Sequence, residues 1–187
     1  MSGIYKSGFT LLEIIIAVAV VALITTVAVP SLWRRAPEHE RKQLISQLNG
    51  FAQHAWHQAM VTGKVHKILF NLGANRIELQ KATDKLADNG EPICEPVSRL
   101  YIAQSFAWPK TLQIKQFIVE GFDMMQKYTG KPSEQIWFYI VPDGLAQSVI
   151  INMLDTKDLL PGKKPRPVSL VLNPFSAQFS VYDTFQK

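Results

Sequence analysis

The sequence predicts an α+β protein in which a long N-terminal helix packs on a sandwich of antiparallel β-sheets. Three observations predict this class. Apolar residues fill positions 9–29, a helical apolar period follows up to residue 63, and short β-rich runs separated by turn residues occupy positions 64–187. Short connections of this kind join antiparallel neighbours, and the 187-residue chain is long enough for one such domain with its own core.

The first element expected is a membrane-spanning helix over residues 9–33. Its apolar part, positions 9–29, has 21 residues, and at about 1.5 Å each they cover the roughly 30 Å of a bilayer core. Glu13 is the one ionisable residue within it. Because a charge deep in a bilayer costs about 2.5–3.5 kcal/mol, Glu13 is a functional-site hypothesis that requires a partner. Pro30 has no amide hydrogen for the carbonyl of Thr26, so a kink is expected there.

Residues 34–63 are expected to form the second half of the same helix, outside the membrane. Leu44, Leu48, Phe51 and Ala55 recur at spacings of three or four residues. This spacing predicts an amphipathic helix with a wide apolar face that lies on other structure. Gly63 marks its expected end.

Residues 64–187 are expected to form the globular antiparallel β domain. The predicted strands are 65–70, 76–81, 112–120, 135–141, 147–153, 168–173 and 178–183. Residues 136–141 have no polar face, which predicts a covered central strand. The alternation slips at Lys115 and Gln116, which predicts a bulge. The polar stretches 82–98 and 121–133 are expected to be loops.

The sequence gives no support for an enzyme. It contains no Gly-x-Ser-x-Gly motif, Gly-rich phosphate loop or paired catalytic carboxylates, so neither catalysis nor a cofactor is expected. His54 and His57 lie three residues apart and could share a metal. No third ligand is near them in the sequence, so a packed helix surface is favoured and no metal is expected. Cys94 is the single cysteine, so no intramolecular disulfide can form.

One dense basic stretch stands out against a modest formal net charge of +5. Residues 161–167 read Pro-Gly-Lys-Lys-Pro-Arg-Pro. The favoured interpretation is a stiff, solvated connector between two strands. The alternative is a phosphate-binding patch that captures DNA, but three cations give few phosphate contacts, so a nucleic-acid partner is not expected.

Residues 6–13, Lys-Ser-Gly-Phe-Thr-Leu-Leu-Glu, resemble the processing site of type IV pilins and type II secretion pseudopilins. The resemblance implies that a prepilin peptidase removes the leader, residues 1–8, by cutting between Gly8 and Phe9, and that the Phe9 amine is methylated. It also implies that Glu13 guides assembly by neutralising the N-terminal amine of a neighbouring subunit. Basic residues flank both ends of the span, so charge alone leaves its orientation open. The resemblance implies a single pass through the inner membrane, with the N-terminus cytoplasmic and the C-terminal domain periplasmic.

Later segments resemble the H-type minor pseudopilin and FimT group. Residues 139–144 read Tyr-Ile-Val-Pro-Asp-Gly, where an aromatic strand ends in a Pro-Asp-Gly turn, and residues 171–175 read Val-Leu-Asn-Pro-Phe. The resemblance implies a pilin-like fold and a structural subunit near the tip of a type II secretion pseudopilus, acting in protein export across the outer membrane. The implied partners are major and minor pseudopilins, the prepilin peptidase and the inner-membrane assembly platform. The alternative is a minor pilin of a type IV pilus, with a role in DNA uptake.

The expected loop 121–133 is a candidate partner surface. It contains four apolar side chains suited to an adaptable contact, Phe122, Met124, Met125 and Tyr128. The alternative is that these side chains fold back and close one end of the sandwich.

Overall fold

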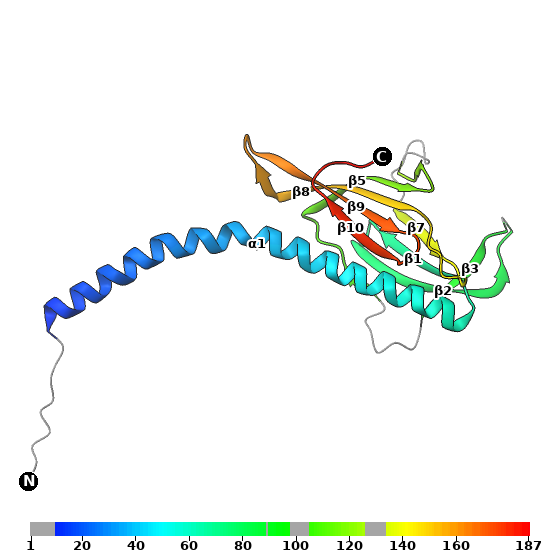
Figure 1. Cartoon of the computed structure of the whole chain (residues 1–187), viewed down its shortest axis with the longest axis horizontal. Coiled ribbons are helices and arrows are strands. Elements are labelled where there is room, and N and C mark those ends of the chain that lie inside the picture. The colour runs from blue at the N-terminus through cyan, green and yellow to red at the C-terminus, as the bar shows by residue number, and fades with distance from the viewer. Residues whose placement is uncertain (1–9, 89, 98–104, 126–133) are drawn as a thin grey trace, which may run out of the picture. The chain divides into compact units, whose positions relative to one another are not determined.

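The computed structural model describes residues 10–88, 90–97, 105–125 and 134–187, except for the side chains of residues 27–37. Within these residues one helix, α1 (Leu11–Thr62), precedes ten strands (Figure 1). The strands are β1 (His66–Asn71), β2 (Arg76–Leu86), β3 (Pro92–Pro96), β4 (Ser105–Ala107), β5 (Leu112–Val119), β6 (Phe122–Asp123), β7 (Gln135–Ile140), β8 (Val149–Leu160), β9 (Lys164–Asn173) and β10 (Gln178–Tyr182). The chain divides into two compact units, Met1–Glu40 and Arg41–Lys187, and each is described by itself.

The second unit contains two antiparallel sheets. The first has the order β3-β2-β1-β7, with β4 pairing beside β3 on the same strand, β2. The second has the order β10-β9-β8-β5-β6. Aromatic side chains of the two sheets meet: Phe70 of β1 lies 5.0 Å from Phe117 of β5, and Phe138 of β7 lies 6.3 Å from Phe179 of β10, between ring centroids. The sheets therefore pack face to face, and the predicted α+β class with an antiparallel sandwich is confirmed.

Several strand predictions need correction. Residues 82–98 are largely not a loop, because β2 continues to Leu86 and pairs with β3. The strand predicted at 136–141 is not central, because β7 lies at the edge of its sheet. Its outer face is partly covered by a neighbouring strand, since Lys67 Nζ lies 4.2 Å from the centre of the Trp137 ring. The bulge predicted at Lys115 and Gln116 is confirmed by a register shift between Ile114 and Gln116.

The second half of α1 supplies one wall of the core. The buried residues recur with the predicted helical spacing, and these are Leu44, Leu48, Phe51, Ala52, Ala55 and Ala59. Three alanines in this set let the helix backbone approach the sheets closely, since a larger side chain would hold it away. The helix ends at Thr62, and Gly63 follows with φ of +63°, the left-handed conformation in which glycine is favoured at a helix C-terminus.

Two polar side chains attach this helix to the ends of strands. Asn49 accepts a hydrogen bond from the Phe179 amide (2.6 Å) and donates one to the Phe179 carbonyl (3.3 Å). Since β10 is an edge strand, Asn49 occupies the place that the backbone of a further strand would take. Trp56 Nε1 donates to the Gly144 carbonyl at 2.7 Å, in the turn after β7. The helix is thus held by directional bonds to both sheets as well as by apolar contact.

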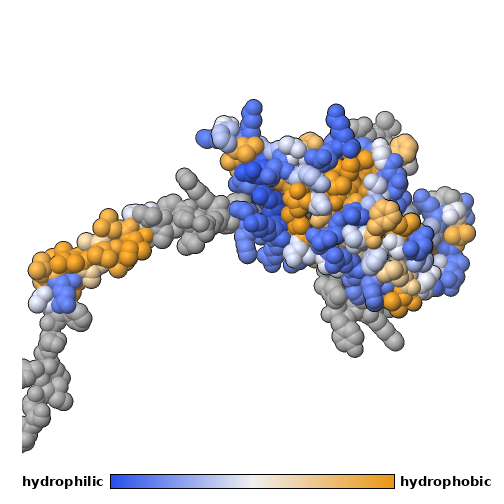
Figure 2. Space-filling model, viewed as in Figure 1, coloured by the Kyte–Doolittle hydropathy of each residue, from blue (hydrophilic) through white to orange (hydrophobic). Residues whose placement is uncertain are grey.

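The first half of α1 has the opposite character. Over residues 11–26 its large apolar side chains are exposed, and Figure 2 colours this segment as mostly hydrophobic. No helix in the described part of the chain is long and apolar enough to cross a membrane.

Candidate functional site

The N-terminal segment begins as a capped helix. Thr10 precedes α1, and its hydroxyl oxygen accepts a hydrogen bond from the Glu13 amide at 3.3 Å. Thr10 and Glu13 therefore occupy the N-cap and N3 positions of a Thr-x-x-Glu capping pattern. The Glu13 carboxylate in the first turn also suits the positive end of the helix dipole. Sequence reasoning missed this local role, although the spacing of the two residues signals it.

Further along the segment, the polar groups are satisfied by the helix itself. Thr25 Oγ1 donates to the Val21 carbonyl at 2.6 Å, and Thr26 Oγ1 donates to the Leu23 carbonyl at 2.8 Å. An apolar helix whose hydroxyls are bonded internally has few polar groups that need water.

Three further residues of the predicted N-terminal site are Gly8, Phe9 and Pro30. Gly8 and Phe9 lie outside the described residues, so the cleavage and methylation site stays a prediction. The helix assignment continues through Pro30 without a break, but the side chain there is outside the described part. The kink at Pro30 therefore stays a prediction as well.

The described residues of the candidate partner loop 121–133 differ in their exposure. Phe122 belongs to the short strand β6 and is 73% exposed, whereas Met124 and Met125 are partly buried against the core. Asp123 fixes this turn, because its Oδ1 accepts hydrogen bonds from the Phe117 and Met125 amides. Tyr128 lies outside the described residues. Among the described members, the exposed ring of Phe122 is the one available for contact with a partner.

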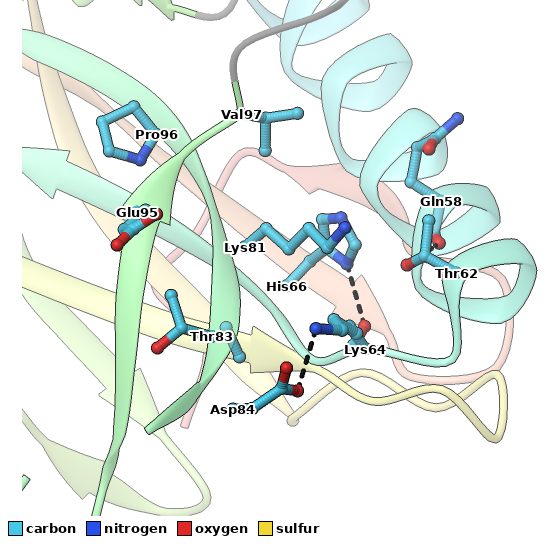
Figure 3. A pocket seen from close by; sticks show the side chains of 11 residues that line it. Gln58, Thr62, Lys64, His66, Lys81, Thr83, Asp84, Glu95, Pro96 and Val97 are labelled. Carbon is cyan, nitrogen blue, oxygen red and sulfur yellow. Dashed lines mark hydrogen bonds and ion pairs between the residues drawn. The ribbon is translucent and has the colours of Figure 1, made fainter. Parts of the chain in front are cut away.

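A polar cleft of about 510 Å³ lies between the end of α1 and strands β2 and β3 (Figure 3). Gln58 and Thr62 line it from the helix, and Lys81, Asp84 and Glu95 line it from the sheet. Lys64 Nζ pairs with Asp84 Oδ1 at 2.9 Å, and the hydrogen bond and charge of Lys64 lower the pKa of Asp84. Two lysines face two carboxylates here, so the cleft has no excess charge that would select an anion or a cation.

His66 also lines this cleft and is 1% exposed. Its Nδ1 lies 3.0 Å from the Lys64 carbonyl, so Nδ1 carries the proton of the neutral ring. Burial lowers the pKa of His66, and the charges of Lys81 and His54 act in the same direction, against the hydrogen bond to Lys64. Burial and the charge of His57 also lower the pKa of His54. Within the described residues no three His, Cys, Asp or Glu side chains form a group that could hold a metal ion.

An ion network that sequence reasoning missed joins α1 to the β8–β9 hairpin. Arg41 Nη1 lies 3.2 Å from Asp155 Oδ2 and 2.9 Å from Asp158 Oδ2. Arg166 Nε lies 2.7 Å from the same Asp158 oxygen. Burial alone acts to raise the pKa of Asp158, but hydrogen bonds from Arg41 and Arg166 and their charges outweigh it and lower the pKa. Asp155 is 2% exposed, and its Oδ1 accepts the amides of Lys157 and Asp158.

This network changes the interpretation of the basic stretch 161–167. Arg166 is occupied by Asp158, and residues 161–163 form the turn of the hairpin. Lys163 and Lys164 remain exposed. The stretch is the tip and return strand of a hairpin rather than a separate connector.

Comparison with known proteins agrees with the N-terminal pattern. Residues 5–29 match the prokaryotic N-terminal methylation motif. No curated protein sequence matches the chain. Two solved structures of the minor pseudopilin EpsH from the type 2 secretion system of Vibrio cholerae are similar in part. One has a TM-score of 0.47 at 10% identity, over 76% of this chain and 95% of that chain. The other has a TM-score of 0.42 at 12% identity, over 77% and 99%.

Both TM-scores lie below 0.5, so this likeness carries no functional conclusion. The methylation motif covers the residues that contain Gly8, Phe9 and Glu13. The helix that follows packs its second half on antiparallel sheets, as the resemblance implies. The chain therefore carries a prokaryotic N-terminal methylation motif, and residues 5–29 that match it include the start of α1.

Proposed function

We propose that the protein is a minor pseudopilin, a structural subunit of a type II secretion pseudopilus. In this proposal a prepilin peptidase removes residues 1–8, the Phe9 amine is methylated, and residues 9–33 hold the subunit in the inner membrane. The helix half 34–63 and the domain 64–187 lie in the periplasm. The match of residues 5–29 to the methylation motif is the observation that carries the proposal.

The exposed apolar side chains of residues 11–26 and the internally bonded Thr25 and Thr26 support residence of this segment in lipid. In lipid, an unpaired Glu13 carboxylate is costly, and the N-terminal amine of a neighbouring subunit offsets that cost. Other pseudopilins, the peptidase and an inner-membrane assembly platform are then the partners. A tip position within the fibre is part of the proposal.

The second candidate, a type IV minor pilin that takes up DNA, is favoured by the exposed Lys163 and Lys164 alone. Because Arg166 is already paired, a patch of two free lysines predicts weak and shallowly salt-dependent DNA binding. The secretion role is therefore the preferred proposal.

Glu13→Gln tests the assembly role with little effect on the helix start. Glutamine also suits the N3 position of a capping box, so the variant removes the charge and keeps the local pattern. In cells that make the whole secretion system, we expect normal processing and membrane insertion, but a loss of the subunit from sheared fibres. Mass spectrometry of the wild-type protein should find an N-terminus at methylated Phe9. The surface variant Glu95→Gln serves as the matched control and should assemble normally.

An intact Met1, or a cut after the apolar segment, would reject the processing site. Normal fibre incorporation of Glu13→Gln at native expression would reject the amine–carboxylate pairing while leaving the processing proposal in place.

A further inference from the structure

The β8–β9 hairpin extends beyond the sheet as an arm. Strand β5 ends its pairing with β8 at Asp155, and β10 pairs with β9 only from Ser169 onward. Residues 157–165, here called the arm, are therefore paired chiefly with each other, through Leu159 with Pro165 and Leu160 with Lys164. Figure 1 shows this hairpin projecting from the sandwich.

The base of the arm is held rigidly against the helix. Arg41 bonds both Asp155 and Asp158, and Arg166 bonds Asp158 from the returning strand. Three of these four side chains are less than one quarter exposed, so water screens the network only partly. The arm therefore has a fixed position relative to the residue at which α1 enters this unit.

The tip of the arm combines apolar and cationic side chains. Leu159 is 51% exposed, and Pro161, Lys163 and Lys164 are exposed. No carboxylate lies between residues 159 and 166 in the sequence. A tip with leucine and proline beside two lysines has the composition of segments that bind at anionic membrane surfaces.

The length of the arm is comparable with the length of chain that joins this unit to the expected span. Arg41 is eight residues from Trp33, the expected end of the span, which is about 12 Å as helix and at most about 29 Å extended. The tip residue Pro161 is six residues from Asp155, or about 20 Å along a strand. The length of the arm therefore lies within the range that chain length allows between Arg41 and the end of the span.

We propose that the tip of the arm docks on anionic lipid headgroups beside the membrane-spanning segment, which holds the domain at the membrane before assembly. This inference rests on the membrane anchoring of the proposed function. Each lysine close to an anionic surface favours the bound state by about fivefold. Two lysines suffice because the span already tethers the domain, so docking is an intramolecular step at high effective concentration.

The test uses the full chain in nanodiscs, with Cys94→Ser as the background and one spin label per protein. The label is placed on the arm through Pro161→Cys. The matched control is Phe175→Cys, an exposed position in the turn at the other end of β9. Accessibility is measured with a neutral nickel chelate. The discs contain either phosphatidylcholine alone, or phosphatidylglycerol and phosphatidylethanolamine in equal amounts.

We expect the accessibility of the label at position 161 to fall at least threefold in anionic discs compared with neutral discs. The label at position 175 should not change. Adding Lys163→Glu and Lys164→Glu should abolish the protection, whereas Lys163→Arg and Lys164→Arg should keep it.

Equal accessibility of the label at position 161 in both kinds of disc overturns the proposal, as does protection by added duplex DNA without protection by lipid. A third label through Val20→Cys reports the anchor. If that label is accessible to the chelate in both discs, the membrane anchoring itself has failed; if it is shielded while position 161 stays accessible, only the docking inference has failed.

Discussion

The two halves of α1 are both rich in apolar residues, yet among the described side chains only those of the second half are buried. In the half before Arg41, Leu23 is 70% exposed, and its neighbours from Leu11 to Ile24 are exposed as well. In the half after it, Leu48 is 0% exposed and lies in the core with both sheets. The helix therefore has two apolar surfaces. The surface of residues 11–26 is exposed, and we propose that lipid covers it. The surface after Arg41 packs on the two sheets of the same chain.

The comparison teaches that the amount of apolar residue in a helix does not decide its environment. Residues 11–26 are apolar on all sides except for Glu13, Thr25 and Thr26, whereas the second half is apolar on one face and polar on the other. The side chains of Asn49 and Arg41, on the polar part of the second half, bond to strands β10 and β8. Four changes to the chain test this difference.

Deleting residues 1–33 should separate the two halves completely. The shortened chain keeps the helix residues that pack in the core, so we expect a soluble, folded and mostly β protein that no longer sediments with membranes. Circular dichroism and membrane flotation check both parts. A spectrum dominated by helix, or a chain that unfolds without its first 33 residues, would contradict the independence of the second unit.

Leu48→Ala and Leu23→Ala should differ strongly although the chemical change is the same. At the buried position the lost contacts and the cavity should lower the free energy of unfolding by about 2–5 kcal/mol. At the exposed position the change should stay within about 0.5 kcal/mol. Urea unfolding of the full chain in mild detergent measures both, and Val61→Ala provides an exposed control on the second half. Equal effects would mean that the first half also packs on the folded unit.

Asn49→Ala should weaken the attachment of the helix to β10. The variant leaves the amide and carbonyl of Phe179 without their side-chain partner, which should cost about 1–3 kcal/mol. Hydrogen exchange should become faster at the Phe179 amide in particular. Gln53→Ala, an exposed position one turn further on, is the control. Unchanged exchange at Phe179 would show that apolar packing alone holds the strand edge.

His66 should make the second unit sensitive to mild acid. Its pKa is lowered in the folded state, so the unfolded chain binds the proton more readily. The stabilising contribution is therefore present above the ordinary histidine pKa of about 6.5 and is lost as the pH falls below it. His66→Gln should flatten the pH dependence of the melting temperature between about pH 7 and 5. The exposed variant Gln53→Ala, which removes no ionisable group, should leave the pH dependence unchanged. An equal flattening by Gln53→Ala would show that the effect does not come from the charge of His66.

Sequence reasoning found most of the architecture because its signals are local. Helical spacing identified Leu44, Leu48 and Phe51 as the buried face, and short β-rich runs separated by turn residues located seven of the strands. It missed β3, because residues 92–96 contain two prolines and a glutamate that resemble a loop. It also placed β7 in the centre of a sheet, because a run without polar residues indicates a strand that is covered on both faces, as central strands are. At the edge of the sheet, side chains from the neighbouring strand supply part of that cover.

The candidate sites also differ in whether their signals are local in the sequence. The motif around Gly8, Phe9 and Glu13 is contiguous, so the sequence alone determined it, and the methylation motif matches the same residues. The network of Arg41, Asp155 and Asp158 joins residues more than a hundred positions apart, and only the tertiary structure decided it. The sequence around a charged residue does not indicate which distant residue will pair with it. That partner depends on which strands pair and where the helix crosses them. The tertiary structure thus shows that the basic stretch 161–167 belongs to the β8–β9 hairpin, in which Arg166 pairs with Asp158 while Lys163 and Lys164 lie outside this ion network.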